Sequence, residues 1–194
     1  QGGEILGVVP KTYIPGYKEY YEERWFAQAD QAATDTVRLC GREAPFGTDM
    51  LFRSEDLPWF CFGVEICEDF WVPIPPSSYQ ALGGAVLLFN LSASNESVGK
   101  AEYRRDLVKQ QSGRCIAGYV YVSSGSGEST TDMVFGGHAI IAENGTILAE
   151  SERFSGEPAL IFTDIDTDRL MSDRQKATSF MEADCECGSW FRKI

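Results

Sequence analysis

The chain has 194 residues, enough for about one domain with an apolar core that needs no disulfide staples. Hydrophobic residues make up 43% and charged residues 24%, as in ordinary soluble globular proteins. The formal net charge of -12 argues against broad electrostatic binding to nucleic acid or anionic lipid. The single histidine, His138, excludes chemistry that needs two histidines, and we expect no metal site.

The first two thirds of the chain predict strands that alternate with helices. In chain order, we expect a strand at Gly3–Val9, a loop with a short helix at Tyr17–Phe26, short strands at Thr36–Leu39 and Leu51–Arg53, a strand at Phe60–Ile66, a helix capped by Ser77 that runs through Leu82, a strand at Ala85–Leu91, a helix at Val98–Arg114 and a strand at Tyr119–Val122. The continuous apolar runs predict strands that are covered on both faces.

The pattern changes after residue 122 and predicts an antiparallel series at Met133–Phe135, Ala139–Ala142 and Ile147–Ser151. Asn144-Gly145 is a strong hairpin signal between the last two strands. A further strand is expected at Ala159–Ile165, followed by a helix that Asp166 caps and that ends at Lys176. Residues 178–194 lack clear periodicity. Together these elements predict an α/β fold with a mixed sheet.

Cys67 is the candidate nucleophile. It follows the apolar run 62–66 and precedes Glu68 and Asp69, so it stands at the exit of a buried strand, where α/β folds place their sites. A helical turn that begins there would offer free backbone N–H groups, which lower a thiol pKa and hold an oxyanion. His138 is an alternative base for such a thiol. The other interpretation is a buried structural cysteine, because flanking acids disfavour a thiolate.

Lys11 and Glu22 are the candidate partners of that thiol. Lys11 follows the first predicted strand, and a lysine near a catalytic thiol stabilises both the thiolate and a tetrahedral oxyanion. Glu22 stands among aromatic residues, whose contact would raise the pKa of its carboxyl. The alternatives are a solvated lysine at a strand end and a surface ion pair of Glu22 with Arg24 or Lys18.

Five strings occur in an order that resembles one known family. They are KTYIPGY at 11–17, YEERWF at 21–26, VEICEDFW at 64–71, NLSAS at 90–94 and GESTTD at 127–132. The chain resembles the nitrilase, or carbon–nitrogen hydrolase, superfamily. Within it, the pattern is similar to the glutamine amidotransferase domain of the glutamine-dependent NAD+ synthetase family, and the resemblance covers roughly residues 1–180.

This resemblance implies an α-β-β-α sandwich and a Glu–Lys–Cys triad. It implies that Cys67 forms a γ-glutamyl thioester with glutamine and releases ammonia. Lys11 would be the triad lysine, which holds the oxyanion with a backbone N–H near Glu68, and Glu22 would support the triad. The positions that would shape the glutamine pocket are Tyr17, Glu68, Trp71 and Ser94.

Two parts of the family pattern have no match in this sequence. The triad also needs a general-base glutamate on an early strand, and the only acid before Lys11 is Glu4, to which we do not assign that role. No synthetase-type pyrophosphate loop occurs. We therefore expect residues 1–180 to be a partial glutaminase domain without the N-terminal part of the sandwich. Residues 181–194 would connect to a synthetase domain, and the chain alone would show little or no glutaminase activity.

The resemblance also implies partners and leaves two other functions open. The expected partners are L-glutamine, the synthetase domain and a second copy of the chain in a homo-oligomer, in the cytoplasm, with no nucleic acid and no membrane. No cofactor is implied for this part, whereas the synthetase domain would use ATP and Mg2+ to amidate nicotinic acid adenine dinucleotide. The alternatives are a stand-alone nitrilase-like amidase or carbamoylase, and a non-catalytic assembly module.

Overall fold

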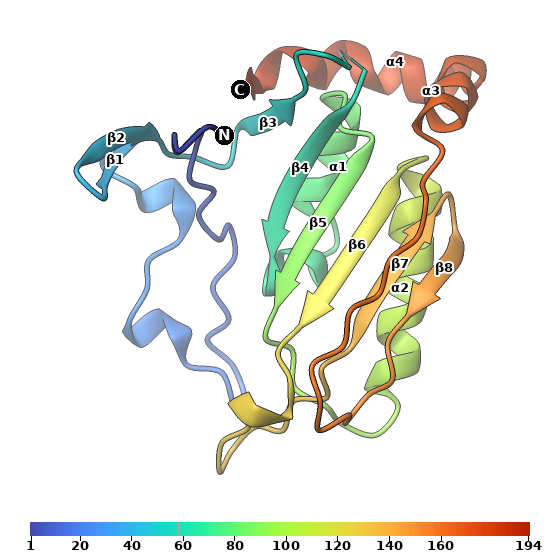
Figure 1. The fold of residues 1–194 in the computed structure, drawn as a ribbon. Helices are drawn as coiled ribbons and strands as arrows, with labels where there is room; N and C mark the ends of the chain where they lie inside the picture. The colour runs from blue at the N-terminus through green and yellow to red at the C-terminus, as the bar shows by residue number, and fades with distance from the viewer. Residues whose placement is uncertain (58) are drawn as a thin grey trace.

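The computed structural model describes residues 1–57 and 59–194, without the side chains of residues 184–186 and 188. Within that part of the chain, seven strands form one mixed sheet in the order β8-β7-β6-β5-β4-β3-β9 (Figure 1). The strands are β3 (Met50–Arg53), β4 (Cys61–Ile66), β5 (Leu87–Ser92), β6 (Gly118–Ser123), β7 (Ala139–Glu143), β8 (Thr146–Glu150) and β9 (Arg192–Lys193). The central strands β4, β5 and β6 are parallel, and antiparallel neighbours flank them on both sides.

The helices cover one face and one end of this sheet. α1 (Pro76–Leu82) and α2 (Lys100–Arg114) connect the parallel strands and lie on the same face (Figure 1). α3 (Thr167–Lys176) and α4 (Thr178–Cys187) lie at the end of the sheet where the parallel strands begin. The short strands β1 (Thr36–Leu39) and β2 (Arg42–Pro45) form a separate antiparallel hairpin.

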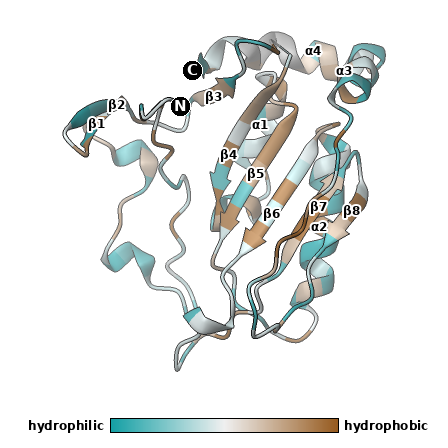
Figure 2. Cartoon of the chain, viewed as in Figure 1, coloured by the Kyte–Doolittle hydropathy of each residue, from teal (hydrophilic) through white to brown (hydrophobic). Residues whose placement is uncertain are grey.

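The two faces of the sheet differ in burial. On the helix side, Leu88, Tyr119, Tyr121 and Ile140 are completely buried and form the centre of the core. The central strands are rich in apolar residues (Figure 2), and some of these, such as Leu91, stay more than half exposed. The described residues therefore form one sheet with one helix layer, which is one α-β half of the expected sandwich.

The structure confirms most predicted elements and corrects three. The predicted strands at Gly3–Val9, Met133–Phe135 and Ala159–Ile165 are wrong, because these segments are irregular. Only Val8 of the first segment makes a bridge, to Phe46. All three segments have apolar side chains, but a strand also needs a neighbour that pairs with its backbone, and local sequence cannot show that neighbour.

The last residues of the chain form regular elements that their sequence pattern did not predict. Residues 178–187 form α4, and Arg192–Lys193 form β9, which pairs in parallel with β3. The Arg192 guanidinium donates two hydrogen bonds to the carboxylate of Asp49, at 2.6 and 2.8 Å, and this bond lowers the pKa of that carboxyl. The sheet thus gains its edge strand from the last residues. Their role as a connector stays a prediction.

A buried carboxyl, Glu65 of β4, takes the place of the predicted cap at the start of α1. Pro75 is the N-cap residue, and the backbone N–H of Ser77 donates to Glu65 Oε2 at 2.8 Å. The hydroxyl of Tyr119 donates to the other oxygen of Glu65. Glu65 is 1% exposed, and this burial raises the pKa of its carboxyl from 4.5 to about 7.

This shift predicts a pH-dependent stability. Because the folded-state pKa of Glu65 is raised, the contribution of its neutral carboxyl to the free energy of unfolding is fully present below about pH 4.5. That contribution is lost as the pH rises through about 7. Glu65→Gln stays neutral, so its free energy of unfolding relative to the native chain should rise by roughly 3 kcal/mol between about pH 4 and about pH 8. Urea unfolding at both pH values measures this. The exposed Glu102→Gln on α2 should show no such change, and a pH-independent difference for Glu65→Gln would contradict the assignment.

Candidate active site

Cys67 lies directly after β4, where the parallel strands end. Its backbone φ is 50°, a left-handed value that is uncommon for residues other than glycine. Such strain is typical of functional sites, where a side chain must be held in one direction. Cys67 begins a short 3-10 turn, Cys67–Phe70, and is 7% exposed.

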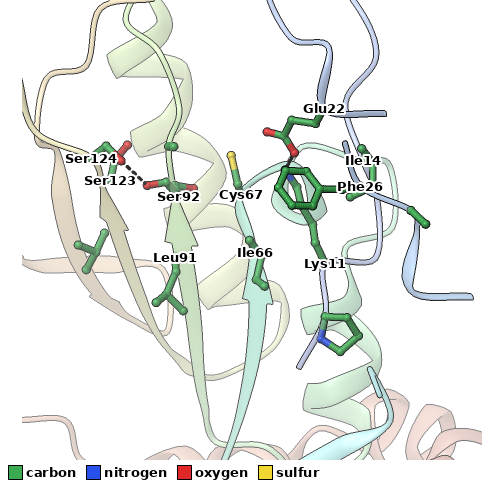
Figure 3. A pocket seen from close by; sticks show the side chains of 14 residues that line it. Lys11, Ile14, Glu22, Phe26, Ile66, Cys67, Leu91, Ser92, Ser123 and Ser124 are labelled. Carbon is green, nitrogen blue, oxygen red and sulfur yellow. Dashed lines mark hydrogen bonds and ion pairs between the residues drawn. The ribbon is translucent and has the colours of Figure 1, made fainter. Parts of the chain in front are cut away.

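The ends of the neighbouring strands line one side of the thiol. Ser92 ends β5 and Ser123 ends β6, next to the end of β4, and Figure 3 shows Cys67 between these strand ends and the N-terminal segment. The meeting of parallel strand ends at one edge is the arrangement that places α/β sites there. The position of Cys67 in the fold is therefore the one expected from its strand.

Lys11 and Glu22 approach the thiol from the N-terminal segment. Lys11 Nζ lies 2.5 Å from Glu22 Oε2, and the side chains are 13% and 31% exposed. Both line a cavity of about 740 Å³ together with Cys67 (Figure 3). The structure thus brings the three predicted catalytic residues together across 45 to 56 residues of sequence. The ion pair of Glu22 is with Lys11, and not with Arg24 or Lys18.

Burial raises the pKa of the Cys67 thiol above its ordinary value of 9.0. Hydrogen bonds from the backbone of Ala93 and the side chain of Ser92 act against this rise, as does the positive charge of Lys11. The thiol is therefore protonated at neutral pH, and a reaction at this sulfur requires a group that takes its proton.

The four predicted substrate-binding residues line a second cavity, which Cys67 also lines together with several charged and polar side chains. This cavity has a volume of about 240 Å³ and is lined by Tyr17, Glu68, Trp71 and Ser94, among others. The Tyr17 hydroxyl donates to Glu68 Oε1 at 2.8 Å. Burial raises the pKa of both side chains, and their mutual hydrogen bond raises that of Tyr17 while lowering that of Glu68. Cys67 is thus shared by the two cavities.

Two residues at this site were not predicted from the sequence. Lys100 begins α2 and lines the second cavity, where its Nζ lies 5.1 Å from the ring centre of Trp71 and donates to Asn95. Burial lowers the pKa of Lys100. Nothing in its local sequence marks it, because only the fold brings the start of α2 to the thiol. The other residue is Asp69, whose place in the 64–71 string was a visible signal.

The carboxyl of Asp69 is 1% exposed and accepts three backbone hydrogen bonds. Burial raises its pKa, and the three N–H donors act against that rise. Asp69 is part of the Cys67–Phe70 turn, but it lines neither cavity that contains Cys67.

His138, the predicted alternative base, and Glu4, which has no predicted role, both lie away from the thiol. His138 is buried just before β7, where its Nδ1 contacts Arg104 Nη1 at 2.9 Å and its Nε2 contacts Glu150 Oε1 at 2.8 Å. It lines neither cavity that contains Cys67, so it is not placed as a base for this thiol. Glu4 pairs with Arg42 at 2.5 Å on the surface, consistent with our leaving it unassigned.

No metal site is seen among the side chains that the structure describes. Within them, no group of three or more histidine, cysteine, aspartate or glutamate residues converges on one point. The side chain of Cys185 is not among the described ones. No helix in the described part of the chain is long and apolar enough to cross a membrane.

Comparison with known proteins identifies the family of the chain. Residues 1–175 match the model of the family described as carbon-nitrogen hydrolase. The chain belongs to the carbon-nitrogen hydrolase family. Over 178 residues it is 49% identical to a glutamine-dependent NAD(+) synthetase from Mycobacterium bovis, and the match covers 92% of this chain. This carbon-nitrogen hydrolase chain spans 26% of that relative's length.

Solved structures of relatives agree with the fold. A glutamine-dependent NAD(+) synthetase from Cytophaga hutchinsonii matches with a TM-score of 0.63 and 31% identity, over 76% of this chain and 23% of that one. A carbon-nitrogen hydrolase from Helicobacter pylori matches with a TM-score of 0.64 over 89% of this chain and 56% of that one. At 16% identity, the second match supports the fold alone.

Proposed function

We propose that this site hydrolyses the side-chain amide of glutamine through a cysteine thioester. The observation that carries the proposal is the shared position of Cys67. Cys67 lines one cavity together with the Lys11–Glu22 pair, and it also lines a smaller cavity of amino-acid size that contains charged and polar side chains. The family membership and the similarity to glutamine-dependent NAD(+) synthetases support the same chemistry.

The proposed reaction begins with attack of Cys67 Sγ on the amide carbon of glutamine. The thiol proton would pass to a general-base carboxylate, a role that we assign to no described residue of this chain, and then to the departing nitrogen, which leaves as ammonia. The ammonium of Lys11 and a backbone N–H of the turn at Glu68 stabilise the oxyanion. Water then attacks the thioester carbonyl, which breaks the C–S bond, releases glutamate and restores the thiol. Glu22 holds the Lys11 ammonium in place through their ion pair.

The second cavity suits the amino-acid end of glutamine. Glu68 offers a carboxylate for the substrate α-ammonium group, and Lys100 offers an ammonium for the α-carboxylate. Tyr17 and Ser94 supply hydroxyl groups, and Trp71 supplies an apolar wall. The pocket therefore offers an opposite charge to each of the two charged groups of a free amino acid. A simple amide has neither of these groups.

Protection of Cys67 from alkylation tests the substrate class. We expect glutamine to slow the reaction of Cys67 with iodoacetamide, with mass spectrometry of the Cys67 peptide as the readout, and asparagine to slow it far less. The buried Cys115 reports on unfolding in the same sample. Equal protection by acetamide or butyramide would favour a stand-alone amidase, and no protection together with a defined oligomer mass would favour an assembly module.

The turnover of the chain alone is expected to be small. In the described residues, no carboxylate other than Glu22 lines the larger cavity beside Cys67, and Glu22 is engaged with Lys11. Incubation with glutamine should therefore release little or no glutamate. Robust glutamate release that disappears in Cys67→Ala would contradict this expectation and would require a base among these residues.

The wider role is also part of the proposal. The ammonia would serve a synthetase domain that amidates nicotinic acid adenine dinucleotide with ATP and Mg2+, within a homo-oligomer. Among the described side chains, no group of three or more histidine, cysteine, aspartate or glutamate residues converges, so no residue of this chain is assigned to Mg2+. A cytoplasmic location is favoured because Cys40, Cys61, Cys67 and Cys115 form no disulfide.

A further inference from the structure

The segment that carries Lys11 has no regular secondary structure. Residues 9–13 belong to no strand and no helix. Upstream, Val8 exchanges backbone hydrogen bonds with Pro45 and Gly47, at 2.8 and 3.2 Å, and the carbonyl of Lys11 accepts from Ala29 at 3.2 Å. No sheet ladder therefore fixes the Lys11 backbone relative to Cys67, although the proposed chemistry needs the ammonium within reach of the sulfur.

The carboxylate of Asp69 supplies the missing link between the two segments. Its Oδ2 accepts from the backbone N–H of Ile66 at 3.0 Å, one residue before Cys67. The same oxygen accepts from the N–H of Thr12 at 3.3 Å, and Oδ1 accepts from the N–H of Tyr13 at 2.8 Å. One side chain thus bonds the residue before the nucleophile and the two residues after the lysine.

The surroundings of Asp69 make this link rigid. The side chain is 1% exposed, so water does not compete for its oxygens. The next residue, Phe70, packs against the buried rings of Tyr119 and Tyr121, with ring centres 5.2 and 5.8 Å apart. A carboxylate with three backbone donors in such a site is held far more firmly than an exposed one.

We propose that Asp69 is a positioning residue that holds Lys11 against Cys67. The proposal rests on the proposed function, in which Lys11 acts on the Cys67 sulfur and on the oxyanion. Asp69 touches neither the substrate nor the reacting atoms. It acts through the backbone, because its two oxygens fix the distance between the Lys11 segment and the turn of Cys67.

The amide of Asp69→Asn cannot replace this clamp. An asparagine has one acceptor oxygen and one NH2 donor, and the NH2 group would face at least one backbone N–H among the three donors. At least one donor would lose its acceptor, and the two segments would separate. The charge of Lys11 would then have less effect on the thiol.

A double-mutant cycle tests the proposal through the rate at which iodoacetamide alkylates Cys67 at about pH 8.5. If Lys11→Met raises the thiol pKa by about one unit, the thiolate fraction falls about tenfold. The more basic thiolate is more nucleophilic, so the net loss of rate should be about threefold. We expect Asp69→Asn to cause a similar loss, and the Lys11→Met/Asp69→Asn variant to react no more slowly than Lys11→Met alone.

A purely structural role of Asp69 would give a different pattern. Asp69→Asn would then change the rate by the same factor whether or not the chain also carries Lys11→Met, and that additivity would overturn the proposal. Asp49→Asn is the matched control, since it removes a carboxylate that bonds Arg192 away from Cys67. It should leave the effect of Lys11→Met unchanged. Alkylation of Cys115 reports on global unfolding in every variant.

A second variant covers the case in which Asp69→Asn does not fold. Asp69→Glu keeps both acceptor oxygens but is longer by one methylene, which pushes the Lys11 segment away from the turn. If Lys11→Met slows the alkylation of Cys67 as much in the Asp69→Glu variant as in the native chain, the proposal is overturned. The cycle uses no glutamine, so its result can be interpreted even if glutamine fails to protect Cys67. The proposed function and the positioning role of Asp69 are therefore tested by separate measurements.

Discussion

Replacing Cys67 by alanine is expected to abolish the covalent reaction of this protein with an electrophilic glutamine analogue. The suitable probe is a glutamine analogue in which a diazoketone replaces the side-chain amide, because attack by a thiol leaves a stable thioether. The rate of labelling should fall by at least about a thousandfold, since alanine offers no nucleophile at the shared wall of the two cavities. Intact-protein and peptide mass spectrometry measure the adduct and its position.

The matched control for this experiment is Cys115→Ala. Cys115 is another buried cysteine whose thiol pKa burial raises to about 12, and it lies away from both cavities that contain Cys67. We expect its replacement to leave the labelling rate nearly unchanged. Substantial labelling of another residue in Cys67→Ala would show that the probe reads surface reactivity, and the proposed nucleophile would be wrong.

Replacing Arg174 by methionine is expected to destabilise the fold by about 3–5 kcal/mol, because an unsatisfied buried acceptor costs about 1–3 kcal/mol. Arg174 lies on α3 and is 5% exposed. Its guanidinium donates to the carbonyl oxygens of Ala85, Cys115 and Ile116, at 2.7, 2.9 and 3.0 Å. Methionine fills similar space but donates no hydrogen bond, so these carbonyls would be left buried and unsatisfied.

The control for this stability prediction is Arg169→Met on the same helix. Its side chain is 64% exposed, and its two ion pairs are long, at 3.9 Å, so the expected loss is below about 1 kcal/mol. Urea unfolding of both variants gives the comparison. A similarly small loss for Arg174→Met would mean that other groups or water satisfy the carbonyls. The labelling rate of folded Cys67 should not change, because Arg174 lies at the opposite end of the parallel strands.

The elements that the sequence predicted correctly share a local cause. The continuous apolar runs of β4, β5 and β6 are typical of buried parallel strands. The Asn144-Gly145 turn adopts the two positive φ angles, 43° and 83°, that its residues favour. Asp166 accepts a hydrogen bond from the N–H of Arg169 at 2.9 Å, as a cap should. Each of these features depends on residues within a few positions of one another.

The errors and omissions also share a cause. The run at 159–165 has the side chains of a strand but no backbone partner, and it leaves Leu160 and Phe162 more than four fifths exposed. The edge strand β9 was missed because it is short and depends on pairing with a strand about 140 residues earlier. The hairpin strand β2 is the exception, because its partner β1 ends only three positions before it and β2 was missed as a short segment with little apolar pattern. Strand pairing is a long-range property, so a window of sequence cannot decide it.

For the candidate site, the sequence alone determined the residue types and the family. It placed Cys67 at the exit of a buried strand, and the order of five strings joined it to Lys11, Glu22 and the second set of polar residues. Only the tertiary structure decided that these residues face two cavities with one common thiol, that Lys100 joins them, and that Asp69 bonds both segments. Burial and hydrogen-bond partners arise from contacts across more than 50 residues of chain, and no spacing rule encodes them.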